Sequence, residues 1–161
     1  MSGTPGDSIL VTGALGQIGR DLVEALRDKH GQDSVIASDV REVEGHPFVE
    51  EGRFVRLSVL DGDAMDSVIE DEDVGTIYHL AAILSATGEQ NPDLCERVNV
   101  GGTITVLEAA RRNDLRVYAP SSIAVFGPDA PATAPQITPL NPTTTYAVSY
   151  THLTLPTKRI V

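Results

Sequence analysis

Short apolar runs alternate with longer amphipathic stretches along this chain. The runs are β-branched and largely apolar, as in strands covered on both faces, and predict strands at Ser8–Thr12, Ser34–Ser38, Arg53–Val59, Thr76–Ala81 and Leu115–Ala119. Between them, helical periodicity predicts helices over Gly16–His30, Gly62–Asp71 and Asp93–Asn113. This alternation implies right-handed crossovers and an α/β fold of the Rossmann type, a doubly wound parallel sheet with strand order 3-2-1-4-5.

The character of the chain changes after residue 126. Five prolines between Pro128 and Pro142 argue against regular elements there, so we expect a long loop. A further helix is expected to begin within Thr143–Ser149.

Composition narrows the possible partners. The 161 residues carry a formal net charge of −11, so nucleic acid and anionic membrane surfaces are not expected as partners, because their phosphates would be repelled. The single cysteine, Cys95, excludes an internal disulfide and is expected to be a small buried side chain. We find neither a secretory leader nor an apolar run of membrane length, so a cytoplasmic protein is expected. No histidine lies at metal-ligand spacing, so no metal site is predicted.

Three glycines follow the first predicted strand and open the first helix. Gly13, Gly16 and Gly19 recur every three residues. Glycine lets a backbone turn tightly and approach a ligand without Cβ obstruction, and a helix N-terminus offers N–H groups to a pyrophosphate. A glycine triplet alone is weakly specific, but its strand–turn–helix context predicts a phosphate-binding turn.

Acidic residues follow the next two strands. Asp39 comes twenty residues after Gly19, where a carboxylate can accept both ribose hydroxyls of an adenosine and repel a 2′-phosphate, which favours NAD over NADP. Arg41 points the other way, because a nearby arginine can accommodate a 2′-phosphate. Asp61 is predicted either to meet the adenine end or to cap the following helix.

Hydroxyl side chains follow the fifth strand. A serine from the pair Ser121–Ser122 can orient a substrate alcohol while Tyr146, as phenolate, takes its proton and a hydride leaves for the nicotinamide. Each residue alone is ordinary, because serine pairs usually form turns and tyrosines usually pack. The order of these features along the chain, a glycine turn, an acid, a serine pair and a tyrosine, supports the hypothesis of a site that oxidises an alcohol with a nicotinamide cofactor.

Over residues 8–149 these motifs resemble the extended short-chain dehydrogenase/reductase superfamily, the NAD-dependent epimerase/dehydratase family. The matching segments are Thr12–Gly19, His79–Ala82 and Ser121–Ser122 ahead of Val125–Gly127. Within the superfamily, Tyr78–Glu89 and Pro120–Pro128 are most similar to short-chain-type L-threonine 3-dehydrogenases. UDP-sugar epimerases share the broad motifs but match less well in both segments.

The resemblance implies NAD-dependent oxidation of L-threonine to 2-amino-3-oxobutanoate by a homodimeric full-length protein. It implies Ser122 and Tyr146 as catalytic residues that also contact the substrate, with Ser85 as a further substrate contact. The cofactor-binding residues expected from the glycine turn, the acids after the strands and this resemblance are Gly13, Leu15, Gly16, Gln17, Ile18, Gly19, Asp39, Leu60, Asp61, Leu80, Ala81, Ala82, Asn99, Pro120 and Tyr146. His79, inside its strand motif, is expected to be packed and hydrogen-bonded rather than an acid or base.

The family pattern fails after Tyr146. The family has a lysine four residues later, on the same helix face, where its ammonium lowers the pKa of the phenol and binds the nicotinamide ribose, whereas this chain has Tyr150. Ser149–Pro156 resembles a translated sequencing adapter. We therefore expect residues 1–149 to be a partial NAD-binding Rossmann domain and 150–161 an aberrant tail, with a divergent native C-terminus as the alternative.

Two other functions stay open. One is a nucleotide-sugar epimerase or dehydratase of the same superfamily, which would need uracil- and diphosphate-binding residues in a C-terminal half. The other is a non-catalytic NAD-binding module that senses redox state through a partner. With about half the length of its relatives and no lysine after Tyr146, the chain itself is expected to be inactive or nearly so.

Overall fold

The computed structural model describes residues 6–41, 43–50, 52–135 and 137–153. The chain divides into two compact units. The first consists of the residues up to Ala81 together with Gly102–Pro120, and the second of Ala82–Gly101 together with the residues from Ser121 on. The first unit contains the whole sheet.

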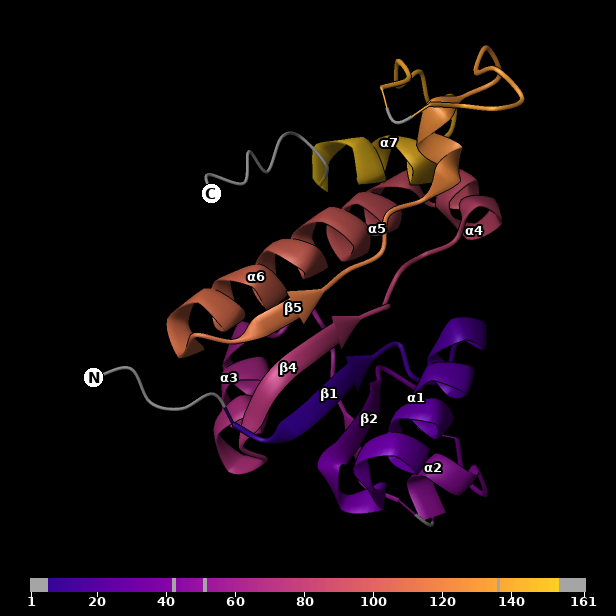
Figure 1. The fold of residues 1–161 in the computed structure, drawn as a ribbon. Helices are drawn as coiled ribbons and strands as arrows, with labels where there is room; N and C mark the ends of the chain where they lie inside the picture. Colours follow the sequence, from indigo (N-terminus) through magenta and orange to yellow (C-terminus); the bar gives the residue numbers. More distant parts are fainter. Residues whose placement is uncertain (1–5, 42, 51, 136, 154–161) are drawn as a thin grey trace. The chain divides into compact units, whose positions relative to one another are not determined.

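Five parallel strands form the sheet of the first unit (Figure 1). They are β1 (Ser8–Thr12), β2 (Val35–Asp39), β3 (Phe54–Arg56), β4 (Val74–His79) and β5 (Arg116–Tyr118). Their order is β3-β2-β1-β4-β5, and every neighbouring pair is parallel. The Rossmann-type α/β fold and the strand order expected from the sequence are therefore confirmed.

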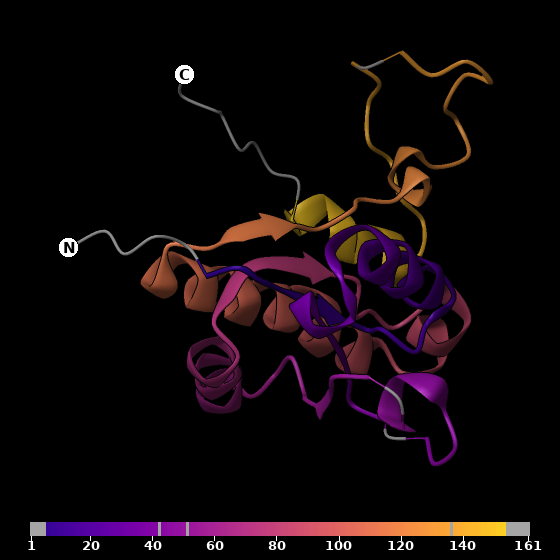
Figure 2. The ribbon, with the colours of Figure 1, turned by 60° about the horizontal axis from the view of Figure 1, so that its bottom comes forward.

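Helices cover both faces of this sheet (Figure 2). Helix α1 (Gln17–His30) lies on one face, and α3 (Gly62–Asp71) and α6 (Gly102–Asn113) lie together on the other. Alternation along the strands divides the core accordingly. Val11 and Ala37 pack into the cluster on the α1 side, whereas Leu10 and its register partners Ile36 and Ile77 form a fully buried row on the other side.

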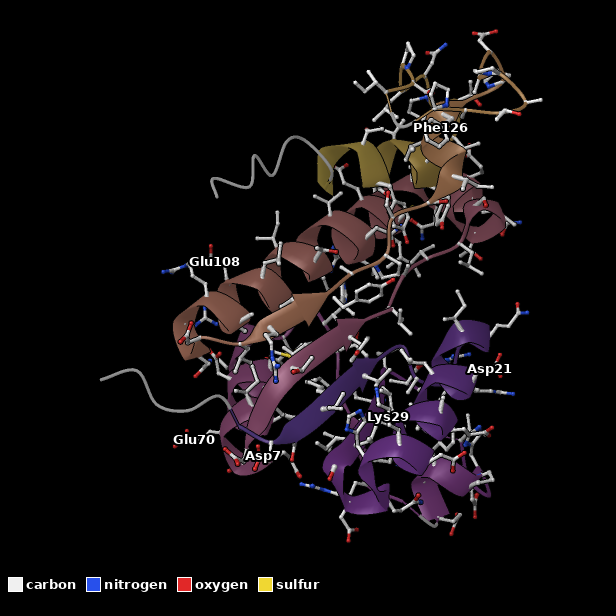
Figure 3. All side chains as sticks on the ribbon, in the orientation of Figure 1. Asp7, Asp21, Lys29, Glu70, Glu108 and Phe126 are labelled. Carbon is white, nitrogen blue, oxygen red and sulfur yellow. The ribbon has the colours of Figure 1, made fainter. Side chains whose placement is uncertain are left out.

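The outer surfaces of these helices are polar. Asp21 and Lys29 of α1 are exposed, and Glu108 of α6 forms an exposed ion pair with Arg111 (Figure 3). This division into a buried apolar side and a solvated charged side is what the helical periodicity predicts. Within the part of the chain that the structure describes, every helix is too short or too polar to cross a membrane.

A buried arginine of α1 contacts the segment that runs from β2 to β3. The 3₁₀ turn η1 (Gln32–Ser34) precedes this segment, and the short helix α2 (Pro47–Glu50) lies within it. Arg27 is 7% exposed and donates to the carbonyl oxygens of Val35 and Arg53, at 3.4 and 3.0 Å. Its guanidinium also lies 5.1 Å from the ring centroid of Phe48. Burial lowers the pKa of this guanidinium.

The second unit consists of short helical pieces. They are α4 (Ser85–Gln90), α5 (Pro92–Glu96), the π-helical turn η2 (Arg97–Gly101), the 3₁₀ turn η3 (Ile123–Phe126) and α7 (Thr145–Leu153). Helix α7 packs against α4, α5, η2 and η3. Between η3 and α7 the described residues form no regular element, as the prolines predict. Gly127, with φ of 72°, lets the start of this loop approach the Asn141 backbone.

Several boundaries differ from those expected. The third strand ends at Arg56 rather than Val59, although the Leu57 N–H still donates to the Asp39 carbonyl at 3.0 Å. The single helix predicted over Asp93–Asn113 is instead divided into α5, η2 and α6, because the backbone forms a π-helical turn at η2. A Cβ on Gly102 would lie 2.6 Å from Val59 Cγ2, so this helix start needs a glycine to pack closely. Asp39 ends β2 rather than following it.

Helix α7 begins at Thr145 and runs past Tyr150 to Leu153, so the first residues of the expected tail continue a helix. The rest of that expected tail, including Pro156, lies outside the described residues.

Candidate active site

The three glycines after β1 have three different structural roles. Gly13 has a φ of 70°, and a Cβ there would lie 2.7 Å from the Ala81 backbone nitrogen. A Cβ on Gly19 would lie 2.3 Å from the Gly13 carbonyl oxygen. Beyond its chain neighbours, a Cβ on Gly16 would have a single atom within 4 Å, the Gly13 carbonyl oxygen at 3.1 Å. Gly13 therefore makes the turn, Gly19 allows close packing, and Gly16 leaves the backbone open to a ligand, which is the division of roles in a dinucleotide-binding turn.

Backbone hydrogen bonds tie this turn to both neighbouring strands. The Ala14 N–H donates to the Ser38 carbonyl at 2.9 Å, beside the end of β2. The Leu80 N–H donates to the Thr12 carbonyl at 3.1 Å, at the end of β4. The turn therefore has a fixed position at the carboxyl edge of the sheet, between the two strands that flank β1, which is where open α/β sheets bind ligands.

The N-terminus of α1 is suited to an anion. Gly16 is its N-cap and provides no side-chain hydrogen bond, and the first turn contains no acidic residue. Gln17 and Ile18, the first two helical residues, are exposed. Free N–H groups and the positive end of the helix dipole would favour a pyrophosphate here.

Asp39 connects this turn to the end of β2. Its carboxylate is 6% exposed, and Oδ2 accepts from the Leu15 backbone N–H at 3.2 Å. Oδ1 accepts from the backbone N–H and the Nε of Arg41, at 3.0 and 3.1 Å. The Asp39–Arg41 ion pair was not expected from the sequence. The only feature of the sequence that could have indicated it is the spacing of two residues between the acid and the base.

The remaining cofactor residues predicted in the first unit also lie at strand ends. Leu80 and Ala81 follow β4 and crowd Gly13, Pro120 follows β5, and Leu60 is 38% exposed after β3. Asp61 is the N-cap of α3, and its Oδ1 accepts from the Ala64 N–H at 3.0 Å. The capping alternative for Asp61 is therefore confirmed, and its contact with adenine stays a prediction.

His79 lies in the core beside the turn. It is 5% exposed, with Nδ1 2.9 Å from Thr12 Oγ1 and Nε2 3.0 Å from Thr103 Oγ1. A neutral ring satisfies both contacts by donating from one nitrogen and accepting at the other. The expectation of a packed, hydrogen-bonded histidine is confirmed. Thr103, on α6, is a partner that no local pattern indicated.

We expect His79 to make the protein less stable in acid. Burial lowers its pKa from 6.5 to about 4, so below pH 6.5 the unfolded chain binds a proton that the folded chain does not. The stability present above pH 6.5 is therefore lost as the pH falls toward 4, by up to about 3 kcal/mol. Urea unfolding across this range should show that the free energy of unfolding depends less on pH in His79→Gln than in the parent chain. The exposed His30, changed to glutamine, is the control, and equal slopes for the parent chain and His79→Gln would contradict the expectation.

The predicted catalytic pair lies in the second unit, where η3 and α7 pack against each other. Ser122 is the N-cap of η3, and its Oγ accepts from the Ala124 N–H at 3.3 Å. Tyr146 is half-buried in the first turn of α7. Ser85, the predicted substrate contact, is exposed at the start of α4, which also packs against α7.

Tyr150 occupies the position four residues after Tyr146. The two rings meet edge to face with centroids 4.9 Å apart. Burial and a hydrogen bond shared with Tyr146 raise the pKa of the Tyr150 phenol. Tyr150 is therefore neutral at ordinary pH, and it gives the Tyr146 phenol no positive charge.

Asn99 joins separate segments of the second unit. From the π-helical turn η2, its Oδ1 accepts from the Ile83 N–H at 2.7 Å, and its Nδ2 donates to the Ile83 carbonyl at 3.1 Å. Nδ2 also donates to Ser149 Oγ at 3.1 Å, and that hydroxyl donates to the Tyr146 carbonyl at 2.7 Å. Ser149 was missed from the sequence, although a serine three residues after a helical tyrosine can donate back to its carbonyl. The cofactor contact expected for Asn99, and that for Ala82 in the same unit, stay predictions.

Cys95 of α5 is fully buried in this unit, as expected. Burial and the nearby Glu89 carboxylate raise the pKa of its thiol, a rise that a hydrogen bond with Ser149 partly offsets, and the raised pKa disfavours the nucleophilic thiolate. Among the described residues, no cluster of three or more histidine, cysteine, aspartate or glutamate side chains could hold a metal ion.

The residues of the first unit fit NAD. The turn leaves open backbone at Gly16, the helix end has neither capping side chain nor carboxylate, and Asp39 offers carboxylate oxygens at the adjacent strand end. A pyrophosphate and a ribose diol are the two chemical groups that this combination recognises.

Comparison with known proteins agrees with this geometry. Residues 9–157 match the NAD dependent epimerase/dehydratase family, which confirms NAD as the expected cofactor. An uncharacterised epimerase/dehydratase of Staphylococcus aureus is 45% identical over 142 residues, 88% of this chain and 44% of the relative.

Solved structures with this fold include threonine dehydrogenases. A monomeric L-threonine 3-dehydrogenase from a metagenome is 45% identical with a TM-score of 0.84, over 89% of this chain and 46% of that one. An L-threonine dehydrogenase from Clostridium difficile is 42% identical with a TM-score of 0.85, over 91% and 46%. The chain thus spans about half the length of the relatives it matches. On the family match and the geometry of its glycine turn, the chain belongs to the NAD-dependent epimerase/dehydratase family.

Proposed function

We propose that this chain is the nucleotide-binding part of an NAD-dependent L-threonine 3-dehydrogenase. The observation that carries the proposed NAD binding is the glycine turn, open to a ligand at Gly16 and joined to the Asp39 carboxylate through the Leu15 N–H. The choice of threonine is supported by likeness to threonine dehydrogenases at 42 and 45% identity. The full-length protein would oxidise the β-hydroxyl of L-threonine to the ketone of 2-amino-3-oxobutanoate.

The chain's own side chains supply the binding and proton-transfer steps. The turn from Gly13 to Gly19 would hold the pyrophosphate, and Asp39 the adenosine ribose. Ser122 Oγ would hydrogen-bond the substrate hydroxyl and orient it, and Tyr146 Oη, as phenolate, would take the hydroxyl proton. NAD⁺ bound at this site would accept the hydride that leaves the same carbon. The hydroxyl carbon thereby loses a hydride, its oxygen loses a proton, and a carbonyl forms.

Two measurements on the 161-residue chain test this proposal. Titration with NAD⁺ should show binding, and the melting temperature should rise with NAD⁺ concentration. Threonine-dependent formation of NADH should be far slower than in complete threonine dehydrogenases, because Tyr150 supplies no ammonium. Failure to bind NAD⁺ would overturn the proposal, and turnover at the rate of complete relatives would overturn the expected inactivity.

Two further assays separate the alternatives, one with a UDP-sugar as substrate and one on a longer form of the protein. Interconversion of a UDP-sugar without net formation of NADH would favour the epimerase. Tight NAD⁺ binding with no turnover, even in a longer form of the protein, would favour the non-catalytic module. The neutral Tyr150, in the position of the family's lysine, is the observation that favours this alternative. A homodimeric full-length protein and a cytoplasmic location remain predictions.

Changing Tyr150 to lysine should increase turnover. The ammonium would lie on the same helix face as Tyr146 and favour its phenolate by Coulomb attraction, so we expect threonine-dependent NADH formation to rise by about tenfold or more. Tyr150→Phe is the matched control, because it also removes the phenol hydroxyl but adds no charge. Equal rates for the two variants, both folded by circular dichroism, would show that charge at this position does not limit the reaction.

A further inference from the structure

A carboxylate of α4 caps the helix that carries the proposed base. Glu89, near the end of α4, accepts from the backbone N–H of Thr145 through Oε1 at 2.7 Å. Thr145 is the first residue of α7 and directly precedes Tyr146. The two partners are 56 residues apart in the sequence and belong to the same unit. This hydrogen bond therefore joins α4 to α7 at the residue beside the candidate catalytic tyrosine.

The start of α7 has two caps of different origin. The first N–H groups of a helix have no acceptor within that helix. Thr144 Oγ1 accepts from the Ala147 N–H at 3.1 Å, which is a local cap made by the residue before the helix. The first turn of α7 contains no acidic residue, so the Glu89 carboxylate supplies the negative charge that this end of the helix dipole favours. Of these two caps, only the one from Glu89 joins α7 to another helix.

Helix α4 also lies close to the tyrosine itself. Gly88 is buried, and a Cβ there would lie 3.0 Å from Cys95 Sγ and 3.8 Å from Tyr146 Cβ. The absence of a side chain at Gly88 lets α4 approach both α5 and the first turn of α7. Two consecutive residues of α4 therefore meet α7, one beside the Tyr146 side chain and the other at the Thr145 N–H.

The same short helix carries the predicted substrate contact. Ser85 begins α4, and Glu89 follows it by four residues, a spacing that places two side chains on the same side of a helix. A substrate hydroxyl can lose its proton to Tyr146 only if the tyrosine lies within hydrogen-bond reach of the bound substrate. The Glu89 bond thus connects the helix that would contact the substrate with the helix that would take its proton.

We propose that Glu89 is a positioning residue for Tyr146. Its carboxylate holds the first turn of α7 against α4 and so fixes the position of the tyrosine relative to Ser85. The role requires an acceptor oxygen at the reach of a glutamate side chain, because the partner is a backbone N–H. The inference rests on the proposed function, in which Tyr146 is the base.

Nuclear magnetic resonance on the 161-residue chain tests this role without catalysis. In Glu89→Ala we expect the Thr145 amide to exchange with solvent about fivefold faster, because its acceptor is lost. The nuclear Overhauser effect between Gly88 and Tyr146 should weaken, and the ring signals of Tyr146 should shift. Glu89→Gln should restore all three observations, since its amide oxygen can still accept from the Thr145 N–H.

Two substitutions in the same unit are the matched controls. Thr144→Ala removes the local cap at the same helix end, so it should speed exchange of the Ala147 amide. It should leave the Overhauser effect between Gly88 and Tyr146 in place, because α4 remains bound to α7. Glu96→Ala removes an exposed carboxylate of α5 and should change none of these signals.

The tyrosines of the first unit provide an internal reference. Tyr78 and Tyr118 contact each other there, and their signals should be the same in every variant. If Thr144→Ala displaces Tyr146 as much as Glu89→Ala does, Glu89 is only a helix cap and the positioning role is wrong. Unchanged Tyr146 signals in folded Glu89→Ala would also overturn it.

Glu89→Asp covers the case in which Glu89→Ala does not fold. It keeps the charge, but its carboxylate is one methylene too short to reach the Thr145 N–H, so it should shift the Tyr146 signals as the alanine variant would. Signals equal to those of the parent chain would show that the hydrogen bond does not hold the tyrosine. NAD⁺ binding is measured separately on the parent chain, and its absence would overturn the proposed function but not the contact between α4 and α7.

Discussion

Gly13→Ala should destabilise the first unit by about 2–4 kcal/mol and abolish NAD⁺ binding. The backbone at this position has a φ of 70°, which costs any residue with a Cβ, and the added carbon would lie 2.7 Å from Ala81 N and 2.8 Å from Ala81 Cα. Both are backbone atoms at the end of β4, so no side chain can rotate to make room. Relief would require the turn and β4 to separate, which would break the Leu80–Thr12 hydrogen bond.

Two other glycines serve as matched controls in urea unfolding and NAD⁺ titration. Gly45 has a similar φ of 75° with no atom within 4 Å of its hypothetical Cβ, so Gly45→Ala isolates the backbone strain, about 1 kcal/mol. Gly16 has an extended backbone with φ of −75°, so Gly16→Ala should largely keep the fold and reduce the affinity for NAD⁺. Equal stability of Gly13→Ala and Gly45→Ala would show that the close approach to Ala81 carries no cost.

Asn99→Leu should destabilise the second unit by about 3 kcal/mol. Leucine is similar in size, but it would leave the partly buried N–H and carbonyl of Ile83 and the buried Ser149 hydroxyl without the partner that Asn99 provides. Urea unfolding followed by far-ultraviolet circular dichroism measures the loss. Asn113→Leu is the control, because Asn113 is exposed at the end of α6 and should cost less than about 1 kcal/mol.

The Asn99 substitution should also change the surroundings of the candidate catalytic residue Tyr146. Ser149 donates to the Tyr146 carbonyl while accepting from Asn99, so the amide helps to fix the first turns of α7. The chain contains no tryptophan, so its tyrosine fluorescence should change in Asn99→Leu at urea concentrations well below unfolding. A stable variant with unchanged fluorescence would mean that Asn99 is dispensable to this segment.

The sheet was predictable because each strand carries a short apolar run and each crossover a helical one. The boundaries that failed depend on contacts beyond the local pattern. Leu57 and Val59 continue the alternating apolar pattern after β3 ends, so the periodicity could not mark the end of the strand. The π-helical turn between α5 and α6 arises where Asn99 bonds to Ile83, sixteen residues away. A helical pattern with apolar residues on both sides of that turn predicts only one continuous helix.

The sequence by itself determined the Rossmann-type sheet, the glycine turn, the acid after the second strand and the membership of the family, because these depend on local periodicity and on fixed spacing. The tertiary structure decided which glycine leaves its backbone open, that Arg41 pairs with Asp39, that His79 lies between two threonines and that Asn99 joins η2 to α7. The Gly13, His79 and Asn99 contacts depend on residues brought together from distant parts of the chain. The Arg41–Asp39 pair depends on side-chain orientation. A linear pattern specifies neither.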